Sequence, residues 1–318
     1  MAASEKDIKW FSETFQKIVT NIEQEFIGKP VAVKHILSSI VAGGHILLED
    51  VPGTGKTALA RILSKTIGGE NTRVQFTPDL LPSDITGISV YDQKNKEFVF
   101  HQGPVFANIV LADEINRASP KTQSALLEVM EEGKVTVDGI TREVPSPFLV
   151  IATQNPVEQA GTYRLPEAQL DRFLMKTSIG YTDHQTSVQI IDGTLKTHSA
   201  KQVVKTDDIV KMQNIAENNY MDPSVSDYII RLVEATRAAT QVKFGSSIRG
   251  GISLAKVAKV WAASVGRNFV TPDDVKELAV VVLGHRLILE AEAEFDGITP
   301  EAVINQILLD VSVPTANK

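Results

Sequence analysis

The sequence contains the stretch Gly43-Gly44-His45-Ile46-Leu47-Leu48-Glu49-Asp50-Val51-Pro52-Gly53-Thr54-Gly55-Lys56-Thr57, from which the interpretation of the whole chain follows. The apolar run Ile46-Leu47-Leu48 is typical of a parallel strand that is covered on both faces. Pro52, Gly53 and Gly55 then force a tight turn, in which successive backbone N–H groups can point into one concavity. Helix-forming residues follow at once. The stretch therefore predicts a buried strand, a glycine turn and a helix that begins at Lys56-Thr57.

A chain of phosphates fits such a turn, because its N–H groups and the following helix N-terminus both carry positive potential. Lys56 is expected to reach the β- and γ-phosphates, and the hydroxyl of Thr57 is expected to hold Mg²⁺. Asp50 departs from the G-x-x-x-x-G-K-[ST] pattern, since it stands at the first glycine position. The alternative is an ordinary strand–helix connection, but the retained glycines favour a nucleotide phosphate loop.

The composition is that of an ordinary globular protein. The chain has 318 residues, of which 43% are hydrophobic and 22% are charged, enough for one large or two modest domains. A formal net charge of -7 argues against sequence-independent binding of nucleic acid. The absence of cysteine excludes disulfides, thiolate metal sites and cysteine nucleophiles. Neither a signal peptide nor an apolar run of roughly 18 residues is visible, so a cytoplasmic protein without a membrane span is expected.

A second apolar run, 107–114, ends in the adjacent carboxylates Asp113 and Glu114. Beside a phosphate loop, Asp113 would hold Mg²⁺ through its water shell and Glu114 would polarise the attacking water. A third apolar run, 148–156, ends in polar residues. Asn155 at its end could hold the same water, with a turn-forming asparagine before proline as the alternative.

Two arginines are further candidates. Arg172 follows Asp171 in a short expected helix, where such a pair is usually a surface ion pair. Placed against a γ-phosphate, Arg172 could instead stabilise charge that develops in the transition state. Arg249 stands at an expected helix start, where its charge opposes the helix dipole and indicates an anionic partner.

The remaining segments give the organisation of the chain. Helical spacing over 5–24 and 31–41 precedes the first strand, and the turn between them places Ile27 and Gly28 as candidates for an adenine pocket or as a simple turn. An irregular insertion at about 77–104 is expected to carry a hairpin from Ile88 to Phe100, and a second hairpin is expected at about 134–144. Beyond about residue 184 helical patterns dominate, at 208–217, 225–240, 252–265, 272–289 and 300–309.

The order of these motifs resembles the AAA+ ATPases, and among them the MoxR family, over nearly the whole chain. The resemblance rests on four stretches: Leu47 to Thr57, Leu111-Ala112-Asp113-Glu114-Ile115-Asn116-Arg117-Ala118, Ala152-Thr153-Gln154-Asn155-Pro156, and Leu165-Pro166-Glu167-Ala168-Gln169-Leu170-Asp171-Arg172-Phe173. It implies an α/β P-loop NTPase core with a parallel sheet over 1–195, followed by a small all-α lid domain over 196–318. Residues Pro52, Gly53, Thr54, Gly55, Lys56, Thr57 and Ala58 would bind ATP, with Ile27 and Gly28 near its base.

The resemblance also assigns catalytic roles. Asp113 and Glu114 correspond to Walker B, and Asn155 corresponds to sensor 1. Arg172 resembles the arginine finger that is offered to a neighbouring subunit's ATP, with Arg117 as the rival. Arg249 matches sensor 2, although the family more often has proline at the position of Ile248.

At the level of function, the resemblance implies Mg²⁺-dependent ATP hydrolysis by a ring-shaped, hexameric homo-oligomer. The cycle would remodel or mature a protein client, often beside a partner with a von Willebrand factor A domain, and both expected hairpins would face the ring pore. The alternatives are a nucleotide-dependent binding switch and a DNA-associated motor of the same fold. Net acidity disfavours the motor, and Glu114 disfavours a pure switch, since binding alone needs no water-polarising carboxylate.

Overall fold

The computed structural model describes residues 3–50, 53–154, 162–163, 165–192, 194 and 198–314. The chain forms two compact units, and each unit is built from segments that are not contiguous in the sequence. One unit comprises 17–172 and 177–210, and we call it the α/β unit. The other comprises 1–16, 173–176 and 211–318, and we call it the helical unit. The first residues thus group with the C-terminal helices, through contacts such as the Lys211 ammonium 3.9 Å from the centre of the Trp10 ring.

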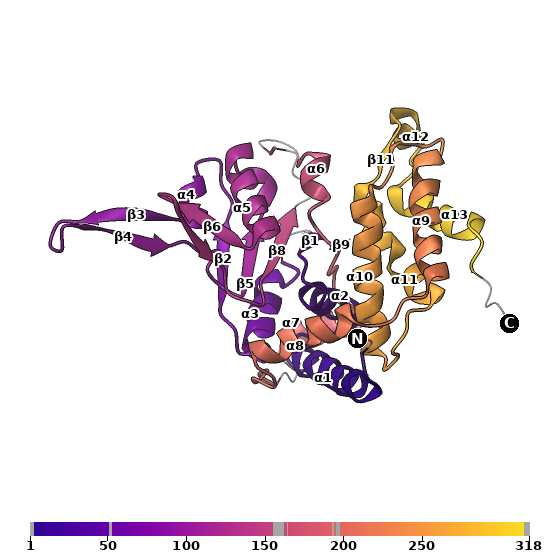
Figure 1. Ribbon diagram of the computed structural model, residues 1–318, viewed down its shortest axis with the longest axis horizontal. Helices are drawn as coiled ribbons and strands as arrows, with labels where there is room; N and C mark the ends of the chain where they lie inside the picture. The colour runs from indigo at the N-terminus through magenta and orange to yellow at the C-terminus, as the bar shows by residue number, and fades with distance from the viewer. Residues whose placement is uncertain are drawn as a thin grey trace. The chain divides into compact units, whose positions relative to one another are not determined.

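The elements of the α/β unit confirm the alternation of strands and helices that the sequence predicts (Figure 1). They are α2 (Pro30–Val41), β1 (Ile46–Glu49), α3 (Lys56–Ile67), β2 (Asn71–Gln75), α4 (Pro82–Thr86), β3 (Gly87–Asp92), β4 (Glu97–Gln102), β5 (Ile109–Asp113), the 3-10 turn η1 (Ile115–Arg117), α5 (Pro120–Glu132), β6 (Lys134–Val137), β7 (Ile140–Glu143), β8 (Leu149–Gln154), α6 (Glu167–Leu170) and α7 (His184–Ile191). Three elements run across the division between the units: α1 (Glu5–Glu23), β9 (Met175–Thr177) and α8 (Thr206–Glu217).

A five-stranded parallel sheet in the order β2-β5-β8-β1-β9 forms the core. All residues of β5 are buried, and so are the first five of β8, which explains why these strands are continuous apolar runs. In the register, Leu48 of β1 lies beside Thr153 of β8, and Ala112 of β5 lies beside Ala152. The carboxyl ends of β1, β8 and β5 therefore meet at one edge of the sheet, where open α/β sheets bind their ligands.

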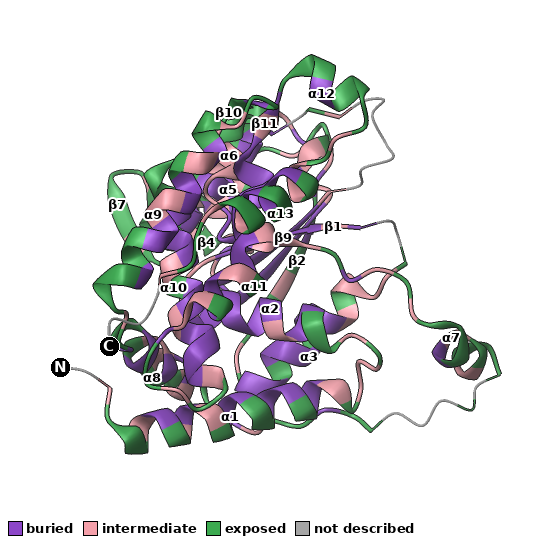
Figure 2. Cartoon of the chain, turned by 90° about the vertical axis from the view of Figure 1, so that its right-hand side faces the viewer, coloured by how far each residue is buried: buried purple, intermediate pink, exposed green. Residues whose placement is uncertain are grey.

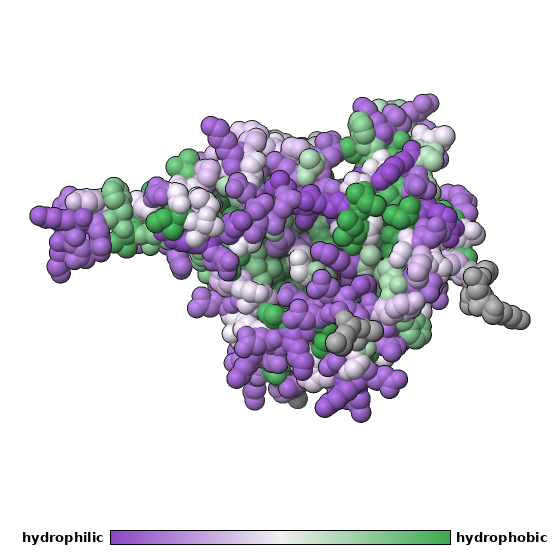
Figure 3. Space-filling model, viewed as in Figure 1, coloured by the Kyte–Doolittle hydropathy of each residue, from purple (hydrophilic) through white to green (hydrophobic). Residues whose placement is uncertain are grey.

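Two hairpins project from this unit, as predicted. β3 pairs with β4 and β6 pairs with β7, both antiparallel, and Figure 1 shows the β3–β4 hairpin extending well beyond the sheet. Figure 3 shows apolar residues along this hairpin behind a hydrophilic tip. Phe98 is 74% exposed and stacks edge-on against Tyr91, with ring centres 5.3 Å apart. The two hairpins touch where the guanidinium of Arg142 lies 3.9 Å from the centre of the Phe100 ring.

Helix α1 has the apolar stripe that its spacing predicts. Its buried residues are Ile8, Phe11, Phe15, Ile18, Val19 and Ile22, each at most 2% exposed. Figure 2 shows this buried face against an exposed opposite face. Among the described residues, no helix is long and apolar enough to cross a membrane.

The helical unit contains most of the helices that the C-terminal pattern predicts. Its elements are α9 (Pro223–Ala238), β10 (Val242–Phe244), α10 (Ile248–Ser264), α11 (Pro272–Leu283), the 3-10 turn η2 (Gly284–Arg286), β11 (Ile288–Leu289), α12 (Ala291–Phe295) and α13 (Pro300–Asp310). Side chains cap two of these helices: Thr271 and Asp274 form a capping box on α11, and Thr299 caps α13.

One prediction in this region is wrong, and several short elements were missed. The helix expected over 272–289 ends at Leu283, and β11 then pairs with β10, so the unit is not purely helical. The buried guanidinium of Arg286 donates a hydrogen bond to the carbonyl of Phe173 at 2.7 Å, which fixes the chain beyond η2 in a new direction. Helices α7 and α12 are only eight and five residues long and give little periodic signal.

A buried histidine ties the first strand to its neighbours. Nε2 of His45 lies 2.9 Å from the carbonyl oxygen of Met130, and Nδ1 accepts the N–H of Val150 at 3.0 Å. These partners require the neutral ring with its proton on Nε2, because a protonated Nδ1 would face another donor. Burial accordingly lowers the pKa of His45 to about 4. The ring thus links α5 and β8 to the start of β1 only in its neutral form.

We therefore predict that acid destabilises the α/β unit partly through His45. Its pKa is lowered on folding, so its stabilisation is present above the unfolded pKa and is lost as the pH falls from about 6.5 towards 4. Between pH 7 and 5 this loss is about 2 kcal/mol. Urea unfolding of His45→Gln, whose amide can serve both partners, should show a pH dependence that is smaller by that amount.

The exposed His101→Gln is the matched control and should keep the wild-type pH dependence. Burial also lowers the pKa of His35 to about 4, so some dependence on pH remains in His45→Gln. An identical pH dependence in His45→Gln and wild type would contradict the assignment.

Candidate nucleotide site and its carboxylate network

The phosphate loop has the backbone that its glycines predict. Gly53 and Gly55 have φ angles of 87° and 89°, in the region that side chains disfavour. A Cβ at Gly55 would lie 2.9 Å from Cε2 of Phe26, whose ring packs against the loop. Gly55 precedes α3 and offers no side-chain cap, so the first-turn N–H groups of α3 remain available to an anion. Pro52 lies outside the described residues.

The polar groups of this loop suit a phosphate chain with its metal ion. The hydroxyl of Thr54 is buried and has no hydrogen-bond partner among the described residues. Lys56 donates to the carbonyl of Asp50 at 3.3 Å, a long bond that a phosphate oxygen could replace. Thr57 is exposed in the first turn of α3, and the half-buried Ala58 follows it. An orphaned hydroxyl, an uncapped helix N-terminus and a lysine are a donor set that fits a triphosphate.

Asp113 and Glu114 meet at the edge of the sheet through a third residue, Thr153. The hydroxyl of Thr153 donates to Oδ1 of Asp113 at 2.7 Å and accepts the N–H of Glu114 at 2.8 Å. Thr153 is fully buried, so both bonds are shielded from water. The other oxygen of Asp113, Oδ2, accepts a hydrogen bond from Arg73 at 2.7 Å. A Mg²⁺ ion that uses Asp113 would share its carboxylate with these two donors.

Glu114 is held in an unusual conformation. Its φ of 58° is left-handed, which is uncommon for a residue with a side chain and costs of order 1 kcal/mol. Its Oε2 accepts hydrogen bonds from Gln75 at 2.7 Å and from Arg117 at 3.1 Å. A carboxylate so engaged is a weaker acceptor for a water proton. Both donors bind the same oxygen, Oε2, so a water molecule that approached this oxygen would compete with them.

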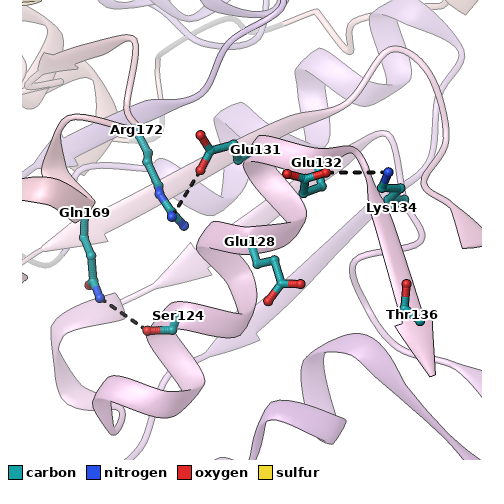
Figure 4. Close-up of a pocket in the computed structure, with 8 residues that line it drawn as sticks. All are labelled: Ser124, Glu128, Glu131, Glu132, Lys134, Thr136, Gln169 and Arg172. Carbon is teal, nitrogen blue, oxygen red and sulfur yellow. Dashed lines mark hydrogen bonds and ion pairs between the residues drawn. The ribbon is translucent and has the colours of Figure 1, made fainter. Parts of the chain in front are cut away.

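Arg172 lies apart from this network, at an acidic cavity of about 460 Å³ (Figure 4). Its guanidinium is 3.1 Å from Oε2 of Glu131, and both side chains are about one-third exposed. Glu128 and Glu132 of the same helix, α5, also line the cavity. Arg172 is therefore held by a carboxylate of its own unit, and Arg117 by Glu114.

The other candidates are placed as follows. Ile27 and Gly28 lie in the turn between α1 and α2, where a Cβ at Gly28 would be 3.7 Å from Oδ2 of Asp183. Arg249 is the second residue of α10, in the helical unit, and its N–H donates to Oγ of Ser247 at 3.1 Å. Asn155 lies outside the described residues.

Sequence analysis missed three members of the network: Arg73, Gln75 and Thr153. Arg73 and Gln75 lie on β2 two positions apart, so alternation places them on one face. Thr153 could have been suspected as a hydroxyl inside an apolar strand, since a buried hydroxyl needs partners. Their partners in β5 could not be read from sequence, because they depend on the strand register.

The fold and the phosphate loop are those of a nucleotide-binding ATPase domain, and comparison with known proteins agrees. Residues 45–175 match the "ATPase family associated with various cellular activities (AAA)", and residues 234–307 match the AAA lid domain. A crystal structure from Cytophaga hutchinsonii, described provisionally as an ATPase, is similar at a TM-score of 0.91 and 39% identity, covering 98% of both chains.

Curated relatives match almost the whole chain. Uncharacterized protein YeaC of Bacillus subtilis is 48% identical, with 94% of each chain covered. Chaperone MoxR1 of Mycobacterium tuberculosis is 43% identical over 96% of this chain and 83% of its own, and Protein MoxR of Paracoccus denitrificans is 28% identical over 91% and 93%. The chain belongs to the MoxR family of AAA+ ATPases.

Thr153 offers a direct test of the network. Thr153→Val keeps the shape of the side chain but leaves the N–H of Glu114 without its acceptor and Asp113 without a donor. We expect kcat for ATP hydrolysis to fall by roughly tenfold or more, since misplaced catalytic groups are costly, while ATP affinity stays within a factor of about three. Thr153→Ser keeps the hydroxyl and should retain most of the activity. Equal rates for the two variants would show that the bridge is not needed.

Proposed function

We propose that the protein hydrolyses ATP with Mg²⁺ and uses the cycle to remodel or mature a protein client. The observation that carries this proposal is the pair Asp113 and Glu114, joined by Thr153 at the carboxyl edge of the sheet. The strand β1, which leads into the phosphate loop, lies beside β8 in the same sheet. A site for binding alone would not need the second carboxylate, whose role in such chemistry is to orient the attacking water.

Each residue then has a defined task. Lys56 and the N–H groups of the loop bind the β- and γ-phosphates, and Thr57 and Asp113 would hold the metal ion, which would supply positive charge to stabilise the transition state. Glu114 accepts a hydrogen bond from the attacking water, in competition with Gln75 and Arg117 at Oε2. Asn155 is assigned to hold the same water, as the family resemblance implies.

We assign the arginine finger to Arg172. Arg117 is bonded to Glu114 of its own site, so it would already neutralise that carboxylate. Arg172 lies instead at the acidic cavity and is about one-third exposed, so its guanidinium could exchange Glu131 for a phosphate oxygen of another subunit. The active site would then be completed in a ring-shaped homo-oligomer, for which we propose six subunits, with Arg249 as sensor 2.

For client handling we propose the two hairpins. Their exposed apolar side chains, Phe98, Tyr91 and Ile140 among them, are costly in water and are suited to transient contact with an unfolded or extended chain. The name of the relative Chaperone MoxR1 supports a chaperone role. We further propose that the protein is cytoplasmic and that it acts together with a partner that contains a von Willebrand factor A domain.

The shared active site predicts that ATPase activity per subunit rises with protein concentration. Arg172→Ala should bind ATP normally yet lose roughly 10³-fold or more in rate at every concentration, because an arginine finger is worth about 10³–10⁵. The measurement is steady-state phosphate release across a dilution series, with sizing of each sample. Arg231→Ala, which removes a surface pair with Asp227, is the control and should behave as wild type.

Activity that does not change with concentration, in samples that are monomeric by sizing, would reject the shared site. A selective loss in Arg117→Ala with normal Arg172→Ala would move the finger to Arg117.

The roles of Lys56 and Glu114 are separable. Lys56→Ala should abolish detectable ATP binding, since the loop loses its charge for the β- and γ-phosphates. Glu114→Gln should bind ATP as tightly as wild type but trap it unhydrolysed, because the amide does not polarise water. Binding by calorimetry and single-turnover hydrolysis distinguish the two. Retained affinity in Lys56→Ala, or unimpaired turnover in Glu114→Gln, would remove that residue from the mechanism.

A further inference from the structure

Asp50, which replaces the usual first glycine of the phosphate loop, makes specific contacts. It is 4% exposed, and its two carboxylate oxygens accept two consecutive backbone N–H groups. Oδ2 accepts from Ile179 at 2.7 Å, and Oδ1 accepts from Gly180 at 2.8 Å. Hydrogen bonds to a buried carboxylate are among the strong ones in proteins. The residue that departs from the motif therefore attaches the start of the loop to a segment 129 residues away.

The segment that Asp50 holds lies against the turn between α1 and α2. The ammonium of Lys29 donates to the carbonyl of Tyr181. A Cβ at Gly28 would lie 3.7 Å from Oδ2 of Asp183 and 3.9 Å from Oγ1 of Thr186, so the backbone of Gly28 lies close to these two side chains. We call residues 26–29 and 179–186 together the base-side wall. All of these residues belong to the α/β unit.

The base-side wall also touches the phosphate loop directly, at one point. The ring of Phe26 packs on Gly55, with 2.9 Å from its Cε2 to the position of an added Cβ. A single van der Waals contact does not fix one segment relative to another, because a ring can slide over a flat surface. The two hydrogen bonds to Asp50 fix both the distance and the orientation of the attached segment.

We propose that Asp50 is a positioning residue that holds the base-side wall in register with the phosphate loop, and so sets how well an adenine nucleotide fits both. This rests on the proposed function, in which Ile27 and Gly28 lie near the base. Only a carboxylate serves here, since glycine provides no acceptor and asparagine turns one acceptor into a donor that faces an N–H.

The proposal is tested with Asp50→Asn by comparing ATP and ADP with inorganic tripolyphosphate, all with Mg²⁺. Tripolyphosphate engages the loop but not the base-side wall. We expect affinity for ATP and ADP to fall tenfold or more, while the tripolyphosphate inhibition constant stays within twofold of wild type. Asp92→Asn is the matched control, because Asp92 also accepts a backbone N–H, from Lys94 at 2.8 Å, but in the β3–β4 turn. It should leave the binding of all three ligands unchanged.

A second variant covers the case in which Asp50→Asn does not fold. Lys29→Met removes the hydrogen bond from the half-exposed Lys29 to the carbonyl of Tyr181 in the same segment. It should show the same selective loss of affinity for ATP and ADP. An equal loss for ATP and tripolyphosphate in either variant would show damage to the loop alone and overturn the proposal, as would an unchanged ratio of the two affinities. Failure of the wild-type protein to bind ATP would instead overturn the proposed function.

Discussion

The arrangement of Asp113 and Glu114 depends on the hydroxyl of Thr153. It is fully buried between β5 and β1, where an unpaired polar group would cost about 1–3 kcal/mol, so its two hydrogen bonds are obligatory. One bond fixes Asp113, and the other fixes the backbone of Glu114 in its left-handed conformation. The parallel register places Thr153 beside Asp113, because the preceding residues, Ala152 and Ala112, are paired across the two strands. A structural requirement of the sheet thus orients two acidic groups at its edge.

The carboxylates of Asp113 and Glu114 also accept hydrogen bonds from other side chains. Arg73 bonds to Asp113, and Gln75 and Arg117 bond to Glu114. These donors are about half-exposed or more, so each contact is worth little and can be exchanged. Arg172 likewise makes a partly exposed ion pair, with Glu131 of its own unit. A bound nucleotide with its metal ion would therefore compete with weak partners at Asp113, Glu114 and Arg172.

Around the phosphate loop the contacts are of the opposite kind. Asp50 and His45 are buried, each makes two hydrogen bonds, and each joins segments that are far apart in sequence. Such contacts are costly to break, because either partner would be left unsatisfied in a dry interior. The loop thus starts from a rigid strand end, whereas the outer contacts of Asp113 and Glu114, to Arg73, Gln75 and Arg117, are exposed and weak.

The sequence by itself determined the features that depend on neighbouring residues. The glycines of the phosphate loop, the apolar runs of β5 and β8 and the stripe of α1 are local patterns, and each was predicted correctly. Only the tertiary structure decided which distant groups meet: Asp113 with Thr153, Glu114 with Gln75, Asp50 with the N–H groups of Ile179 and Gly180. It also decided the end of α11 and the pairing of β10 with β11, strands of three and two residues. The physical reason is that hydrogen bonds between segments depend on register and packing, which no local pattern encodes.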